Sequence, residues 1–282
     1  AAALYYRRNA PRCRPLADKS GGAHAVMLIS EDGTKILKPL DQGTVEVDNY
    51  RALARTPLGP FLPGFYGVRS VAGYEVGFMV MDSAYVGMEP PFATLDIKVG
   101  KKTWDDHAKP EKIEKESKKF DEVYTKSSAM DGFRVAGMKA GDLSLSSDNL
   151  KPRHSLLTSE FGEWLLPAFF ADHPGYGALP AGMAGECRPV PGAGCAVDLA
   201  SAREALGQLK ALAAAAELGF GGTLRASSLL LTREMRTGGR WRIKLIDLMH
   251  YTLTGKARDD NFCDGLQQLV RTWERWLTAA GG

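Results

Sequence analysis

The sequence predicts a mixed α/β protein of two lobes, a small one rich in β-strands and a larger one that holds most of the helices. Short apolar runs separated by turn residues dominate the first part of the chain, and most segments with helical spacing come later. A loop at 83–90 that contains Gly and Pro joins the two parts. The chain has 282 residues, of which 44% are apolar and 24% charged, enough for two lobes with a shared cleft.

The predicted small lobe covers residues 1–82. Asp32-Gly33 lies between two short apolar runs and predicts a β-hairpin, because this dipeptide favours the tight turns that join antiparallel strands. Residues 44–56 have the apolar spacing of a helix, and residues 73–82 read as a further strand.

The predicted larger lobe covers residues 83–282 and mixes strands with longer helices. Its elements, in order, are a strand at 91–100, a helix at 111–120, a strand at 131–139, a short helix at 159–171, a loop at 173–197, a helix from Asp198 to Gly219, a hairpin around Gly238-Gly239 and a C-terminal helix through 266–277.

Charge, cysteines and missing motifs exclude several classes of protein. The net charge is only +3, and the four cysteines form no CxxC pair, so we expect free thiols in a reducing compartment. No apolar run is long enough to span a bilayer. The sequence has no GxxxxGK[ST], HRD or DFG motif, which argues against P-loop enzymes and ordinary protein kinases.

Asp96 and Lys98 are the most suggestive pair of charged residues. They stand two positions apart in a predicted strand whose alternate residues are apolar, so both side chains point to the same face. Taken alone, such a pair is more typical of a solvated strand edge. In a cleft, a carboxylate that orients a hydroxyl and a cation beside it would suit phosphoryl transfer.

Two further features fit the same chemistry. Asp247 follows a buried-looking strand, where a carboxylate is costly unless it is paired, binds a metal or caps a turn. Lys38 ends the first hairpin and Glu46 opens the next helix. Protein-kinase-like enzymes use such a lysine and glutamate to hold ATP phosphates, although a solvated surface pair has the same sequence pattern.

A lysine face is predicted on the helix after the Asp96 strand. Lys112, Lys115 and Lys119 have the i, i+3, i+7 spacing of one helical face. The acidic residues between them are equally typical of a solvated helix. Several ammonium groups on one face could also share the phosphates of a small, highly phosphorylated molecule. Nucleic acid fits less well, because the patch is short, carries acidic residues and has no aromatic residues interleaved with the lysines.

Together these features resemble the inositol polyphosphate kinase family, whose signature is PxxxDxKxG. The matching segments follow the family's order over nearly the full chain: ILKPL, VEVDNY, PFLPGFYGV, MVMD, DIKVGKKTW, SSAMDGFRVAGM, ASSLLL, KLIDLMHY and DDNFCDGL. One departure is Phe92, which stands where the signature has proline, while Pro91 stands one residue earlier.

This resemblance implies a two-lobed, protein-kinase-like α/β fold with an antiparallel sheet in each lobe and ATP in the cleft between them. Residues 1–82 would form the ATP-binding lobe, and segment 105–130 of the larger lobe would bind inositol phosphate. Lys151 and Arg153 follow the family's basic turn only loosely.

The resemblance also implies roles for individual residues. Asp96 and Lys98 match the catalytic pair, and Lys98 would also contact substrate phosphate. Asp247 matches the aspartate that binds Mg²⁺. The nucleotide would contact Lys38, Glu46, Met81, Asp82, Ser83, Ser228 and Asp247. The inositol phosphate would contact Lys112, Lys115 and Lys119.

The expected activity is transfer of the ATP γ-phosphate to a hydroxyl of an inositol tris- or tetrakisphosphate, as in the multikinase branch. Only the short segment 101–131 separates DxKxG from the GFR strand, and it lacks the long insertion of the trisphosphate 3-kinases. A hexakisphosphate kinase that makes pyrophosphates remains an alternative, and a non-catalytic inositol-phosphate-binding scaffold is a second one. We expect a cytoplasmic or nuclear monomer that binds no nucleic acid, and contact with phosphoinositide lipids stays open.

Overall fold

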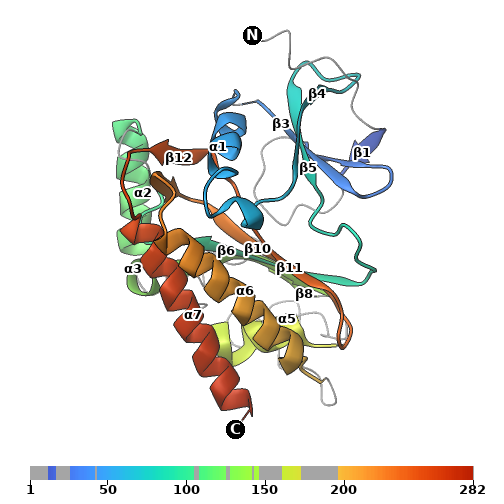
Figure 1. The fold of residues 1–282 in the computed structure, drawn as a ribbon, viewed down its shortest axis with the longest axis vertical. Helices are drawn as coiled ribbons and strands as arrows, with labels where there is room; N and C mark the ends of the chain where they lie inside the picture. Colours follow the sequence, from blue (N-terminus) through green and yellow to red (C-terminus); the bar gives the residue numbers. More distant parts are fainter. Residues whose placement is uncertain are drawn as a thin grey trace.

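The computed structural model describes residues 12–16, 26–41, 43–104, 108–124, 128–141, 143–145, 161–172 and 196–281. Two five-stranded sheets, both antiparallel throughout, and one two-stranded sheet form the framework (Figure 1). Across these ranges, no helix is long and apolar enough to cross a membrane.

The first sheet is built by the N-terminal part of the chain, with strand order β1-β2-β3-β5-β4. Its strands are β1 (Cys13–Pro15), β2 (Leu28–Ser30), β3 (Lys35–Pro39), β4 (Phe65–Ser70) and β5 (Gly77–Asp82). The predicted hairpin is confirmed: β2 and β3 pair around Gly33, whose φ of +70° suits the turn. The sequence pattern missed β4, because its Gly and Pro neighbours read as a loop.

The two faces of this sheet belong to different hydrophobic clusters. A small cluster on one face contains Leu28, Leu37, Phe78 and Val80. On the other face, Met79 packs with helix α1 (Val45–Leu53) and the 3₁₀ helix η2 (Gly59–Phe61) into the large core that continues through the second lobe. The small lobe therefore shares one of its faces with the core of the large lobe.

The second sheet has the order β11-β10-β6-β7-β8, which puts β6 (Phe92–Val99) at its centre. The other strands are β7 (Phe133–Ala140), β8 (Leu143–Leu145), β10 (Ser228–Glu234) and β11 (Trp241–Ile246). Leu95, Ile97 and Val99 of β6 are fully buried, as the alternating pattern predicted. Lys98 lies opposite Ser228 of β10 and Arg134 of β7.

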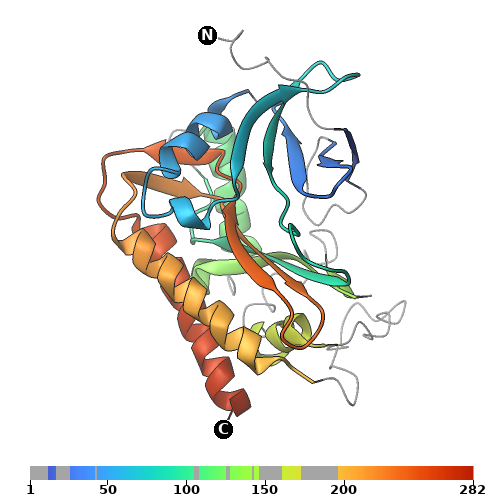
Figure 2. The same ribbon diagram turned by 45° about the vertical axis from the view of Figure 1, so that its right-hand side comes forward.

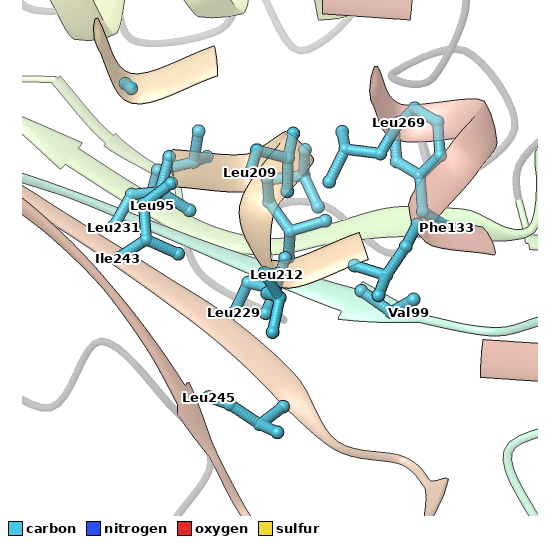
Figure 3. Close-up of a cluster of buried hydrophobic side chains, with 14 of the residues drawn as sticks. Leu95, Val99, Phe133, Leu209, Leu212, Leu229, Leu231, Ile243, Leu245 and Leu269 are labelled. Carbon is cyan, nitrogen blue, oxygen red and sulfur yellow. The ribbon is translucent and has the colours of Figure 1, made fainter. Parts of the chain in front are cut away.

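Helices cover the apolar face of this sheet. The longest are α6 (Leu199–Glu217) and α7 (Asp260–Gly281), which lie along the same side (Figure 2). The π-helical turn η4 (Phe161–Leu165) and α5 (Leu166–Phe170) complete the layer. Leu209 and Leu212 of α6 and Leu269 of α7 meet the buried leucines and valines of β6, β10 and β11 (Figure 3). Asp198 begins α6 as predicted, accepting a hydrogen bond from the Ser201 N–H at 3.0 Å.

The remaining elements lie at the end of the sheet where β6 finishes. Helix α2 (Pro110–Glu122) and the short α3 (Ser128–Asp131) connect β6 to β7, and β9 (Gly222–Arg225) pairs with β12 (His250–Leu253) beside α1 (Figure 1). The β9–β12 pair was not predicted. Lys151, Arg153 and most of the loop predicted at 173–197 lie outside the described residues.

Candidate functional site

Asp96 and Lys98 share one face of β6, opposite the face that packs in the core. Both side chains are partly exposed, whereas the neighbours Leu95, Ile97 and Val99 are fully buried. The prediction that this strand presents an acid and an amine together is confirmed. The physical cause is the two-residue period of a strand whose apolar positions are fixed by the helices beneath.

Lys98 donates hydrogen bonds to three groups of the site. Its Nζ donates to the carbonyl of Ala226 at 3.0 Å, to the hydroxyl of Ser228 at 2.9 Å and to Oδ2 of Asp247 at 3.4 Å. Three strands or their ends thus converge on one ammonium group. Ser228 is completely buried, so its hydroxyl has a fixed position beside the amine.

Two residues with strained backbone conformations bind the Lys98 amine. Ala226 and Asp247, with φ of +53° and +60°, are the only non-glycine residues with positive φ in the part of the chain that the structure describes. Each contributes an oxygen to Lys98. A left-handed conformation costs an L-residue about 1–2 kcal/mol, so the surrounding structure must enforce both.

Asp247 lies where the two lobes meet. It follows the last residue of β11, and its Oδ1 accepts a hydrogen bond from Nζ of Lys38 in β3 at 3.2 Å. Lys38 also donates to Oε1 of Glu46 at 2.8 Å, and Glu46 is only 3% exposed on α1. The structure therefore joins the predicted lysine–glutamate pair of the small lobe directly to the carboxylate of the large lobe.

The pKa values of the two carboxylates of the site are shifted in opposite directions. Burial raises the pKa of Asp96 above its usual range, although Lys98 opposes the shift. Burial also acts on Asp247, but there the ammonium groups of Lys98 and Lys38 outweigh it and lower the pKa below the usual range. Oδ1 of Asp96 is buried without a hydrogen-bond partner. Asp247 is thus held ionised, whereas the charged form of Asp96 is destabilised.

Asp247 suits a divalent cation bound together with a nucleotide. Its side chain is 42% exposed, and its two oxygens already bind two cations. No group of three or more metal-ligating side chains occurs within the described ranges. Mg²⁺ commonly binds through one or two carboxylates and takes its other ligands from phosphates and water, so this donor set fits a metal–nucleotide complex.

The end of β5 only partly matches the predicted nucleotide contacts. Asp82 lies opposite Lys35 on the face away from Lys38, where its carboxylate accepts hydrogen bonds from Lys35, Tyr66 and the Gly64 N–H. The expected approach of the Asp82 side chain to a nucleotide therefore finds no support in this geometry. The reason is strand alternation, which turns Asp82 to the face opposite that of Met81.

Met81 lies on the same sheet face as Lys38, since it pairs with Ile36 two positions along β3. Ser83 is buried, and its N–H donates to the carbonyl of Thr34 at 2.9 Å. Main-chain contacts of Met81 and Ser83 with an adenine ring stay predictions.

The lysine helix α2 lies next to the turn that follows Asp247. Nζ of Lys112 is 3.3 Å from Nε2 of His250, the first residue of β12. Lys115 is exposed, and Lys119 forms a 2.6 Å ion pair with Glu116. The structure therefore brings Lys112 to the Asp247 turn, while Lys119 turns toward its own helix.

Arg134 and His250 were not assigned from the sequence. Arg134 is only 8% exposed, lies opposite Lys98, donates to the Ser128 hydroxyl at 3.2 Å and stacks over the Tyr124 ring at 4.3 Å. Burial lowers the pKa of Arg134, while Tyr124, Glu116 and Asp96 favour its charged form. Only the strand register reveals this position, whereas His250 was visible in the sequence three residues after Asp247.

Comparisons with known proteins show similarity over part of the sequence and in the fold. The profile of the family described as "Inositol polyphosphate kinase" matches residues 78–175. Over these residues the chain is similar to the inositol polyphosphate kinase family. Inositol polyphosphate multikinase alpha of Arabidopsis thaliana is 30% identical over 136 residues, which span 45% of this chain and 46% of that protein, about half of each.

Two solved structures have the same fold. The structure of the inositol phosphate multikinase Ipk2 from S. cerevisiae in complex with ADP and Mn²⁺ has a TM-score of 0.64 and 20% identity, and covers 87% of this chain and 100% of that one. A structure from structural studies and protein engineering of inositol phosphate multikinase has a TM-score of 0.61 and 20% identity, covering 82% and 98%. These matches confirm the predicted two-lobed α/β fold.

Proposed function

We propose that this protein is an ATP-dependent inositol polyphosphate kinase of the multikinase type. The observation that carries the proposal is the convergence of Lys38, Lys98 and Asp247 within hydrogen-bonding distance at the junction of the lobes. Asp96 lies on the same strand face, and a lysine helix lies alongside. Phosphoryl transfer needs such an arrangement, because its catalysis consists mainly of positioning and charge stabilisation.

The nucleotide would bind between residues 1–82 and 83–282, which we propose as the two lobes. Asp247 and Glu46 raise the pKa of Lys38 despite its burial, so this residue is an ammonium ion at neutral pH. The 2.8 Å bond to Glu46 holds it beside Asp247, in place for the phosphates of ATP. Ser228 accepts a hydrogen bond from Lys98 at 2.9 Å and would face the same phosphates.

Mg²⁺ would be held by Asp247, with most other ligands supplied by phosphate and water. When bound, the metal would neutralise charge on the transferred phosphoryl group. The protein's own contribution is a carboxylate whose lowered pKa keeps it ionised. Lys38 and Lys98, the partners of Asp247 in this structure, would also be able to bind phosphate oxygens.

The acceptor hydroxyl would bind at Asp96. The buried Oδ1 of Asp96 has no partner in the protein, so a hydroxyl of the substrate could donate to it. The raised pKa makes this carboxylate a better proton acceptor than an ordinary aspartate. Lys98, two residues on, would stabilise the negative charge on the transferred phosphoryl group.

The phosphates of the substrate would bind to the lysine face of α2. Lys112 contacts His250, three residues after Asp247, and Lys115 is exposed to solvent. An inositol ring with several phosphates could use this face in more than one orientation, as a multikinase requires. The names of the matched plant and yeast relatives support this branch of the family.

Product profiling would test the proposal. The purified protein is incubated with ATP, Mg²⁺ and an inositol tris-, tetrakis- or hexakisphosphate, and the products are separated, with Asp96→Asn as the inactive control. We expect added phosphates on free hydroxyls of the tris- and tetrakisphosphates. Pyrophosphate formation from the hexakisphosphate alone would instead support a hexakisphosphate kinase, and tight binding without any product would support a scaffold.

A further inference from the structure

The turn that carries Asp247 needs support from outside its own strand. Asp247 is left-handed, with φ of +60°, and the chain then turns through Leu248 and Met249 into β12. Such a conformation is costly for aspartate and persists only where neighbouring groups hold the main chain. The position of the carboxylate therefore depends on contacts made to the carbonyls of this turn.

Asn49 of α1 supplies such contacts from the small lobe, in addition to the Tyr251 N–H, which donates to the Leu248 carbonyl at 3.2 Å. Nδ2 of Asn49 donates to the carbonyl of Leu248 at 2.8 Å and to that of Met249 at 3.3 Å. Both partners are carbonyl oxygens, which only accept hydrogen bonds. The group of Asn49 that meets them must therefore be its amide nitrogen, which donates. Asn49 stands three residues after Glu46, on the same side of the helix. One helix thus fixes Lys38 through Glu46 and the Asp247 turn through Asn49.

The role of Asn49 becomes larger when nucleotide binds. In this structure the Asp247 carboxylate is also held by Lys38 and Lys98, at 3.2 and 3.4 Å. Both amines face the site where phosphates would bind, and a phosphate oxygen competes with the carboxylate for them. Once they turn away, the orientation of Asp247 depends on its main chain.

We propose that Asn49 is a positioning residue that holds Asp247 in the orientation in which it binds the metal of a metal–nucleotide complex. The inference rests on the proposed function, since it assigns the metal to Asp247. It adds that the first helix of the small lobe sets metal affinity through a side-chain amide that touches neither metal nor nucleotide.

A general interlobe contact is the competing explanation for Asn49. Lys244 of β11 provides the matched control, because its Nζ also donates to two carbonyls of the small lobe, Pro60 at 3.1 Å and Leu62 at 2.9 Å. Lys244→Met removes an equal number of interlobe hydrogen bonds without touching the Asp247 turn. If Asn49 served only to join the lobes, the two variants would behave alike.

Calorimetric titration with ADP, in the presence and absence of Mn²⁺, separates these explanations. The quantity compared is the gain in ADP affinity that Mn²⁺ produces, which cancels effects on nucleotide binding alone. Loss of a pair of hydrogen bonds worth about 1 kcal/mol should reduce this gain about 5- to 10-fold in Asn49→Ala. Asn49→Gln, which keeps the amide donor, should recover most of the gain, and Lys244→Met should retain it.

Asn49→Ala is expected to fold, because alanine favours helices and the position is only partly buried; a thermal melt checks this. A wild-type Mn²⁺ gain in Asn49→Ala, or an equal loss in Lys244→Met, would overturn the role of Asn49. Asp247→Asn should abolish the gain altogether. If the wild-type protein shows no Mn²⁺ gain, or Asp247→Asn retains it, the metal assignment in the proposed function fails, and the inference fails with it.

Discussion

The strands beneath the site and helix α2 beside it are held in different ways. The floor of the proposed site, which we define as Asp96, Lys98, Ser228 and Asp247, lies on or directly after the adjacent strands β6, β10 and β11. Main-chain ladders and a fully buried layer fix these strands. By contrast, α2 has no buried residue and is tied to the body by contacts such as Lys112–His250 and Trp104–Phe120.

This difference suits two separate tasks, phosphoryl transfer at the floor and substrate binding at α2. Groups that must meet the reacting atoms need positions fixed to a fraction of an ångström, and a central strand provides them. A helix with few buried contacts has low local stability and can adjust to different arrangements of phosphates. We therefore expect changes in the floor to act on turnover and changes in α2 to act on substrate affinity.

The largest effect is expected in the floor. Asp96→Asn should lower kcat by a factor of about 10² to 10⁴, because it removes the group that orients and accepts from the substrate hydroxyl. Its thermal midpoint should equal or exceed that of the wild type, since the lost charge was buried with one unpartnered oxygen. Initial rates and a thermal melt check both points, and near-normal turnover would remove Asp96 from the reaction.

A smaller and different effect is expected in α2. Lys115→Ala should raise KM for inositol phosphate several-fold, because an exposed charged contact to phosphate contributes about 1 kcal/mol, and should leave KM for ATP unchanged. Lys118→Ala is the control on the same helix, since Lys118 is paired with Glu122 at 3.9 Å. Equal effects of the two substitutions would show that the lysines of α2 act through their overall charge and not through specific contacts with the substrate.

The opposite pKa shifts of the two carboxylates can be tested through stability. Because the folded-state pKa of Asp96 is raised, its charge destabilises the fold above that pKa, and this cost disappears as pH falls through it. The stability advantage of Asp96→Asn over the wild type should therefore shrink between pH 7 and pH 4. Folding that raises a pKa by one pH unit corresponds to about 1.4 kcal/mol of lost stability. Denaturant unfolding measures the advantage at each pH; an advantage that grows toward acid would contradict the assignment.

The smallest effect concerns the strained carbonyl that binds Lys98. Ala226→Gly removes the cost of φ +53° but makes the unfolded chain more flexible, so we expect a net stabilisation of about 0.5 kcal/mol or less. Activity should persist, because the carbonyl remains. Ala211→Gly, at an exposed position inside α6, should instead destabilise by about 1 kcal/mol. Equal losses in both variants would show that Ala226 is not strained.

Much of the floor was predictable from sequence, because a strand's alternation fixes which residues share a face. Asp96 and Lys98 follow directly from the apolar positions around them. Asp247, Lys38 and Glu46 were singled out from the sequence pattern, and the family resemblance implied their roles. Their contacts with one another follow from the fold.

The rest depended on register and on the turn geometry. Arg134 lies opposite Lys98 only because β6 and β7 pair with one particular alignment and a bulge. The contact of Asn49 with Leu248 joins positions far apart in the chain, and no local pattern indicates it. The sheet face of Asp82 follows from its pairing with Lys35, which a motif does not give, and its contact with a nucleotide stays a prediction.

Hydrogen–deuterium exchange, measured with and without an inositol trisphosphate, tests most directly the claim that the floor is preformed and that α2 binds the substrate. We predict slow exchange in β6 and β10 that hardly changes on ligand addition. Exchange in α2 should be fast in the free protein and clearly slower with ligand. Unchanged exchange in α2, together with new protection on another surface, would contradict the account.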